Sequence, residues 1–350
     1  MKNIIIGISV MILLITSCKK NHEVNEIEKN INYPAAYIVN GEDASISVIQ
    51  LSTNYLTETI NLVDHTGTHS IMWPHHVFHH KNIDMHHLAI GVPGMDLSLG
   101  HTGGMPGHGG QFAIMDAVKG TISKIVTLPL MNHNAIYTPD GLEIWTSQMD
   151  MDGKVLVYDA NTFVLKNTIN VGMDPAEVTF SADGTKAYVC NGGDNSVTII
   201  NPSTKAIITT VSVGANPVGA WPSSIGKMFV DNEDGLSISV LDVATDAVVS
   251  TIHLGYKPGY AAYNSTTGEL WVSNSTDGKV AYYLDMGSNI WMKHGEFVTG
   301  ADAHAIAFYG NYAYVTNQGA NTVSIINLTT HAKIKDVLVG KKPNGIAIKL

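Results

Sequence analysis

The feature that most constrains the fold is a unit of about forty residues that recurs along most of the chain. The segment AYVCNGGDNSVTIINPSTKAIITTVSVG at 187–214 aligns with AYVTNQGANTVSIINLTTHAKIKDVLVG at 313–340. Looser copies occupy 36–63, 144–172, 228–255 and 270–285. The marker position, usually an asparagine, falls at Asn40, Gln148, Asn191, Asn232, Asn274 and Asn317, and Val92 marks a degenerate copy.

Each unit alternates apolar and polar residues in short runs that Gly, Asn, Asp and Pro interrupt, which predicts four β-strands joined by turns. A unit of this size cannot bury both faces of its sheet, so the copies must stack radially. The sequence therefore predicts an all-β fold, a seven-bladed β-propeller of four-stranded blades over residues 35–350. Residues 36–63 supply only three strands of blade 1, and 341–350 matches the first strand of the other units. The C-terminal strand is thus expected to complete blade 1 and close the ring.

The motif YVTN, followed by NTVSIIN and a VG-x-x-P linker, resembles the YVTN-type propeller repeat family, which is similar to the cytochrome d1-like propellers. The resemblance covers residues 36–350 and implies the same propeller fold. Nitrous oxide reductase also holds a histidine-bound copper cluster in a seven-bladed propeller, but this chain lacks the cysteine-rich copper motif of that enzyme. No CxxCH motif is present, so no attached c-type haem is expected. Neither activity is predicted.

The first eighteen residues, MKNIIIGISVMILLITSC, combine a lysine, an apolar run and small residues, which is the layout of a secretory signal. The small residues before Cys18 resemble a bacterial lipobox, and this resemblance implies that Cys18 carries the lipid anchor. An ordinary cleaved signal with an incidental cysteine is the alternative. Residues 19–34 are polar and predict a tether. We therefore expect a lipoprotein of the bacterial cell envelope, periplasmic or surface-facing, that contacts the membrane only through its lipid.

Charge and composition narrow the set of partners. The formal net charge of −10 argues against nucleic acid. Every basic residue is a lysine, so the chain has no guanidinium group for bidentate recognition of phosphate. With Cys18 lipidated, Cys190 is the only remaining thiol, and no intramolecular disulfide is expected.

Histidines recur at one position of the repeat. Alignment of the first strand of each blade places these residues in one column: His75, His133, Ala176, Val218, Gly259, His304 and Asn344. Three of the seven blades thus carry an imidazole at the same height of the central channel, near one of its mouths. His76 is adjacent on the blade 2 strand.

Blade 2 also carries an insertion rich in His, Met and Gly at residues 92–110. This loop and the linker 64–74 emerge from the end of the ring that holds the histidine column, so further side chains should gather over that mouth. These are His65, His69, His101 and His108, with Met72, Met95 and Met105. By contrast, His79, His80, His86 and His87 flank a turn at the opposite end, where we expect an exposed turn without function.

These residue types favour a transition metal. Neutral imidazole suits copper and zinc, whereas the thioether of methionine favours copper, so copper is the first expectation and zinc the alternative. The core ligands would be His75, His133 and His304. The supplementary ligands would be His76, His65, His69, His101, His108, Met95 and Met105. Metal storage, delivery, sensing or redox chemistry would each fit, and hydrogen-bonded histidines that merely close the channel are the structural alternative.

Two other functions stay open at this point. The propeller face could bind a protein or a glycan, with any metal incidental. Alternatively, a lactonase-like hydrolase would hold a divalent ion on Glu177, Asn134 and Asp302, and oxygen ligands of this kind would favour calcium. The histidine column fits the second alternative poorly.

Overall fold

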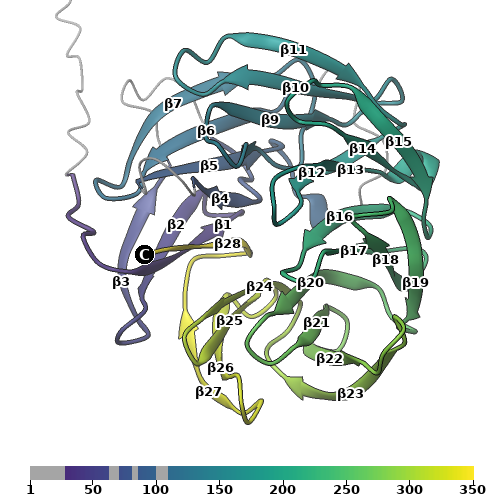
Figure 1. Cartoon of the computed structure of the whole chain (residues 1–350). Helices are drawn as coiled ribbons and strands as arrows, with labels where there is room; N and C mark the ends of the chain where they lie inside the picture. Colours follow the sequence, from purple (N-terminus) through teal and green to yellow (C-terminus); the bar gives the residue numbers. More distant parts are fainter. Residues whose placement is uncertain (1–27, 63–70, 81–85, 100–108) are drawn as a thin grey trace, which may run out of the picture.

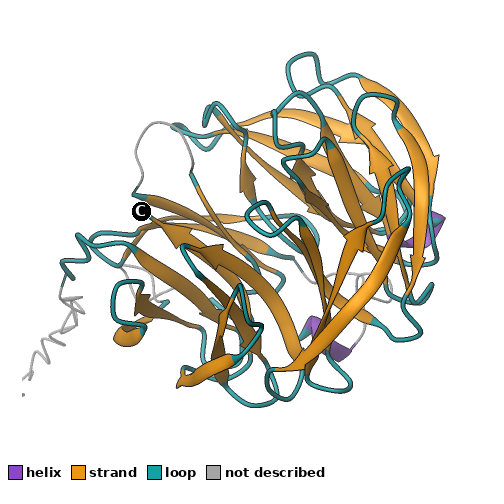
Figure 2. Cartoon of the chain, turned by 60° about the horizontal axis from the view of Figure 1, so that its bottom comes forward, coloured by secondary structure: helices purple, strands orange, loops and turns teal. Residues whose placement is uncertain are grey.

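The computed structural model describes residues 28–62, 71–80, 86–99 and 109–350. Figure 1 shows seven four-stranded antiparallel sheets set as blades around a central axis, which confirms the predicted seven-bladed β-propeller. Figure 2 shows that the described chain is almost entirely strand and loop, with two short 3-10 helices. Among the described residues, no helix is long and apolar enough to cross a membrane.

Blades 1 to 4 follow one another along the chain. Blade 1 contains β28 (Pro343–Lys349), β1 (Ala35–Asn40), β2 (Ser45–Gln50) and β3 (Tyr55–Asn61). Blade 2 contains β4 (Val77–His79), β5 (His87–Val92), β6 (Gln111–Asp116) and β7 (Thr121–Thr127), with the 3-10 helix η1 (Leu97–Leu99) after β5. Blade 3 contains β8 (Ile136–Tyr137), β9 (Glu143–Gln148), β10 (Lys154–Asp159) and β11 (Leu165–Asn170). Blade 4 contains β12 (Pro175–Phe180), β13 (Ala187–Asn191), β14 (Ser196–Ile200) and β15 (Ile207–Ser212), with η2 (Gly192–Asp194) after β13.

The remaining three blades repeat the same order. Blade 5 contains β16 (Pro217–Pro222), β17 (Lys227–Asn232), β18 (Ser237–Asp242) and β19 (Ala247–His253). Blade 6 contains β20 (Pro258–Asn264), β21 (Glu269–Asn274), β22 (Lys279–Asp285) and β23 (Trp291–Val298). Blade 7 contains β24 (Ala303–Tyr309), β25 (Tyr312–Asn317), β26 (Thr322–Asn327) and β27 (Lys333–Leu338).

The two ends of the propeller meet in blade 1, as the sequence predicts. Strand β28 pairs with β1 in an antiparallel register that sets Ala35 opposite Lys349 and Tyr37 opposite Ala347. Figure 1 shows β28 beside β1 on the inner side of that blade. This pairing closes the ring and gives β1 partners on both sides, which removes a free sheet edge.

The repeat motif has a direct structural cause. The Asn317 side chain donates hydrogen bonds to the hydroxyl groups of Thr322, at 3.0 Å, and Ser324, at 2.9 Å, and so fixes the turn between β25 and β26. The linker glycine packs against the same amide, since a Cβ on Gly300 would lie 2.8 Å from Asn317 Cγ. Asn191 makes the equivalent bonds to Ser196 and Thr198. The asparagine and the glycine recur together because they touch.

The core is divided among the spaces between adjacent blades. Successive residues of a strand point to opposite faces. In β9, Ile144 therefore packs with blade 2 residues such as Phe112, whereas Trp145 packs with blade 4 residues such as Phe180. Equivalent apolar clusters fill all the remaining interfaces between neighbouring blades. Each blade is thus stabilised by both of its neighbours.

The described part of the predicted tether packs onto the propeller. Ile31 is only 1% exposed, and its amide donates to the Val118 carbonyl at 2.9 Å. The Lys349 ammonium donates to the Ile31 carbonyl at 2.9 Å. Residues 29–34 therefore belong to the packed domain, while residues 1–27, with the predicted lipid acceptor Cys18, lie outside the described residues.

Candidate metal centre

The innermost strands are irregular at the channel mouth where the histidine column lies. In blades 5 and 6 the register of the inner strand shifts between Pro217 and Gly219 and between Pro258 and Tyr260. Such bulges change the direction in which side chains point and are common beside functional sites. In blade 2 the regular strand begins only at Val77, so His75 and His76 precede it. Both imidazoles line the same cavity, although strict strand alternation would separate them.

Backbone hydrogen bonds and two glycines hold these histidines. The His75 amide donates to the Gly91 carbonyl, and the Gly91 amide donates to the His76 carbonyl, both at 2.9 Å. The Gly345 amide of blade 1 donates to the His75 carbonyl at 2.9 Å. A Cβ on Gly91 would lie 2.7 Å from the His133 carbonyl oxygen, so only glycine lets blade 3 approach blade 2 this closely.

Three imidazoles meet at this point. His75, His76 and His133 are 5%, 3% and 1% exposed. The ring centroid of His75 lies 4.4 Å from that of His76 and 4.5 Å from that of His133. The centroids of His76 and His133 are 5.1 Å apart. One nitrogen from each ring lies within 4.8 Å of the nitrogens of the other two. This spacing allows all three to bind one ion.

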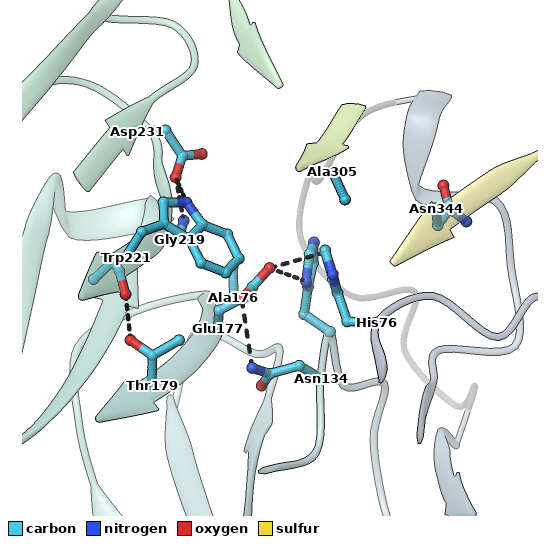
Figure 3. Close-up of polar contacts among 12 residues, drawn as sticks. His76, Asn134, Ala176, Glu177, Thr179, Gly219, Trp221, Asp231, Ala305 and Asn344 are labelled. Atoms are coloured by element: carbon cyan, nitrogen blue, oxygen red, sulfur yellow. Dashed lines mark hydrogen bonds and ion pairs between the residues drawn. The ribbon is translucent and has the colours of Figure 1, made fainter. Parts of the chain in front are cut away.

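A buried carboxylate touches two of the three rings. Glu177 Oε1 lies 3.0 Å from His76 Nε2 and 3.2 Å from His133 Nδ1, and Glu177 is 1% exposed (Figure 3). Asn134 donates to Glu177 Oε2 at 3.4 Å and to the Val178 carbonyl at 2.9 Å, and so fixes the carboxylate. Burial alone would raise the pKa of Glu177, but His76 and His133 lower it to about 2. The group is therefore a carboxylate at neutral pH.

His304 stands beside this cluster rather than within it. Its ring centroid lies 5.9 Å from that of His75 and 5.8 Å from that of His76. Its Nε2 is buried and has no hydrogen-bond partner among the described residues. Burial, together with the charges of His76 and His133, lowers the pKa of His304 to about 3, so the imidazole is neutral and available to a ligand.

An aromatic pair forms another wall of the channel. The rings of Trp221 and Tyr260 have centroids 3.8 Å apart, and those of Trp221 and His76 are 6.1 Å apart. Asp231 Oδ1 accepts hydrogen bonds from Trp221 Nε1 at 2.7 Å and from the Gly219 amide at 3.2 Å (Figure 3). These contacts fix the indole across the channel.

Burial raises the pKa of Asp231 well above its usual range, and the nearby charges of Glu177 and Glu233 raise it further. The sequence analysis did not single out this carboxyl group. A signal was present, however, because the equivalent position of the other blades holds a small or apolar residue. These residues are Val39, Gly91, Ser147, Cys190, Ser273 and Thr316.

The histidines open onto a cavity of about 150 Å³. His75, His76, His133 and His304 all line it, together with residues of the linkers and turns at this end of the ring. Those residues include Leu97, Ser98, Lys257, Ser275, Asp302 and Gln318. An ion held by the three imidazoles would therefore keep one side open to a small molecule.

The other predicted ligands are distributed differently. Met95 packs against Leu97, Met131 and Met149. Met72 is 54% exposed. The remaining residues, His65, His69, His101, His108 and Met105, lie outside the described residues.

At the opposite end, the expectation of an exposed turn is wrong for His80. This ring is 6% exposed, and it packs edge-on against Tyr137 with centroids 4.6 Å apart. Its Nε2 lies 3.3 Å from the Gly141 carbonyl oxygen. His80 directly follows strand β4, and its side chain lies in the interface with blade 3. The cluster of histidines in the sequence gives no sign of this burial.

Comparison with known families gives one match. The model of the choice-of-anchor I domain matches residues 142–343, which is more than half of the chain. The matched segment contains Glu177 and His304 but not the three clustered histidines. No curated protein matches the sequence.

Solved structures resemble the chain at low sequence identity. Hydrazine synthase of Kuenenia stuttgartiensis aligns over 80% of this chain and 91% of its own, with 17% identity and a TM-score of 0.63. The periplasmic gluconolactonase PpgL of Pseudomonas aeruginosa aligns over 91% and 99%, with 13% identity and a TM-score of 0.70. Dihydro-heme d1 dehydrogenase NirN aligns over 89% and 74%, with 12% identity and a TM-score of 0.59. At these identities the likeness shows the propeller fold alone.

Proposed function

The chain belongs to the choice-of-anchor I domain family, and we propose that its propeller binds a transition metal, copper in preference to zinc. The ligands would be His75, His76 and His133, with His304 able to approach from the cavity side. The observation that carries the proposal is the meeting of three buried imidazoles from two blades beside the buried carboxylate of Glu177.

The chemistry of the donors supports a transition metal over calcium. Imidazole suits zinc, copper, iron and nickel, and among divalent ions copper binds nitrogen sites most tightly. A carboxylate that contacts ligating histidines orients their rings and strengthens them as ligands, which is the part that Glu177 would play.

A lactonase-like calcium centre has less support. It would need oxygen ligands from Glu177, Asn134 and Asp302. The Asn134 amide instead donates to Glu177 and Val178, and its Oδ1 accepts from the Val178 amide at 3.3 Å. Asn134 therefore serves the fold of blade 4, and imidazoles rather than oxygens surround Glu177.

The site fits a role in copper handling. The cavity would leave one side of a bound ion open, as delivery to a partner or reaction with a small molecule requires. In the cell envelope, the location that Cys18 predicts, the lipid would keep this activity at the membrane surface.

The test is a titration of the full chain with Cu(II) and, separately, Zn(II), with the free ion set by a competing chelator. The variant His75→Ala/His76→Ala/His133→Ala should lose tight binding of one equivalent of copper, whereas a control with the exposed residues changed, His253→Ala/His294→Ala, should keep it. Equal copper binding by both variants would end the assignment. The single variant His133→Gln provides the comparison if the triple variant does not fold.

A further inference from the structure

Three methionines gather at the same mouth of the channel, outside the histidine cluster. Met131 and Met149 are 4% and 2% exposed and pack against Leu97, and the half-buried Met95 completes the group. They come from three different segments of the chain: the loop after β5, the linker before β8 and the turn after β9. We call Met95, Met131 and Met149 the methionine cluster.

The backbone holds Met131 and Met149 next to each other. The Met149 amide donates to the Met131 carbonyl at 2.9 Å. The neighbouring Gln148 side chain accepts from the Leu130 amide at 3.0 Å and donates to the Leu130 carbonyl at 3.3 Å. These bonds tie the linker to the end of β9, so the backbone that carries Met131 and Met149 is held in place.

The methionine cluster lies next to the histidine cavity. Met131 stands two residues before His133 in the same linker. Leu97, which packs directly on Met131 and Met149, also lines the cavity together with His75 and His76. Leu97 is thus shared between the methionine cluster and the cavity into which the imidazoles open.

Methionine is also concentrated around this mouth beyond the cluster. Met72 and Met173 lie in linkers between blades, and Met151 follows Met149 in the turn after β9. Met72 and Met151 are 54% and 60% exposed, so their thioethers are accessible from solvent. Exposed and half-buried thioethers would give an incoming ion a path to the buried pair.

We propose that Met95, Met131 and Met149 form a second metal site, selective for Cu(I), beside the histidine centre. Thioether sulfur is a soft, neutral ligand that favours Cu(I), whereas imidazole also serves Cu(II) and zinc. Because a thioether does not take up a proton in this pH range, binding at the methionine cluster should persist in acid. The second site stands on its own observations and does not require the histidine centre to be correct.

The test uses substitutions that remove sulfur but keep volume. Leucine replaces methionine with little loss of packing, so Met95→Leu/Met131→Leu/Met149→Leu should remain folded. Under anaerobic conditions at about pH 5, competition with a Cu(I)-specific chelator should show that the variant binds Cu(I) about tenfold or more weakly than the unchanged chain. X-ray absorption of the unchanged Cu(I) form should show sulfur neighbours that the variant lacks.

Matched controls separate this site from the histidine centre. Met115→Leu/Met228→Leu changes two buried methionines of the blade core and should leave Cu(I) affinity unchanged. The histidine triple variant should keep acid-stable Cu(I) binding, so a failed histidine centre leaves this result intact. The proposal is wrong if the methionine variant binds Cu(I) like the unchanged chain, or if no sulfur neighbours appear. If the methionine triple variant does not fold, the single variant Met95→Leu, at a half-buried position, should still weaken Cu(I) binding.

Discussion

Replacement of Glu177 by glutamine tests whether the buried carboxylate strengthens the histidine centre. Glu177→Gln keeps the size of the side chain but removes its negative charge. The amide must turn either its oxygen or its NH2 group toward the two imidazoles that Glu177 Oε1 now contacts, at 3.0 Å for His76 and 3.2 Å for His133. If the NH2 group faces the rings, both imidazoles lose their acceptor; if the oxygen faces them, the NH2 group meets the Asn134 amide, which now donates to Glu177 Oε2 at 3.4 Å. Either orientation also removes the negative charge beside the rings.

The size of the effect follows from the role of such partners. Loss of a carboxylate behind ligating histidines typically costs about 10- to 100-fold in metal affinity. This range corresponds to roughly 1.4–2.8 kcal/mol of binding free energy. Because Glu177 is 1% exposed, water cannot replace the lost contact, and we expect the upper half of the range.

The assay is a Cu(II) titration against a competing chelator, with thermal unfolding of both proteins as a check on the fold. Glu233→Gln is the control, because Glu233 lines the same cavity and forms an ion pair with Lys257 at 2.5 Å. It reports the general effect of one fewer negative charge. Equal losses in the two variants, or unchanged affinity in Glu177→Gln, would refute the reasoning.

Three further predictions follow from the same geometry. Copper affinity should fall as the pH drops below about 6, because protons compete for the imidazole nitrogens. Copper titrations at several pH values measure this fall, and an affinity that does not change with pH would exclude histidine ligands. Gly91→Ala should destabilise the fold by about 1–3 kcal/mol, measured by denaturant unfolding, because the added Cβ would lie 2.7 Å from the His133 carbonyl oxygen. Unchanged stability would contradict that close approach of the two blades. Deletion of residues 343–350 should abolish cooperative unfolding and promote association, since β1 would become an open edge; a monomer that melts like the intact chain would show that ring closure is unimportant.

The propeller could be predicted because its causes are local and repeated. The alternation of apolar residues sets which neighbour each strand residue meets, and the asparagine and linker glycine of each unit touch across one turn. Ring closure was predictable for the same reason, since the C-terminal segment carries the pattern of an inner strand that blade 1 lacks.

The candidate site was predictable only in outline. The repeat placed His75 and His133 at one height, but the irregular backbone before β4 brings His76 into the cluster more closely than His304. That irregularity depends on how two blades fit together, with Gly91 at the contact, and no local pattern encodes it. The fixed position of Trp221 across the channel likewise depends on Asp231, which lies on the neighbouring strand.

The central claim is that His75, His76 and His133 bind one copper ion, and a crystal structure of the copper-loaded chain tests it most directly. Anomalous scattering recorded at the copper absorption edge locates the ion without reference to the surrounding density. The expected result is one strong peak about 2 Å from a nitrogen of each of the three rings. No copper peak between the three rings, with the rings holding their positions, would contradict the account.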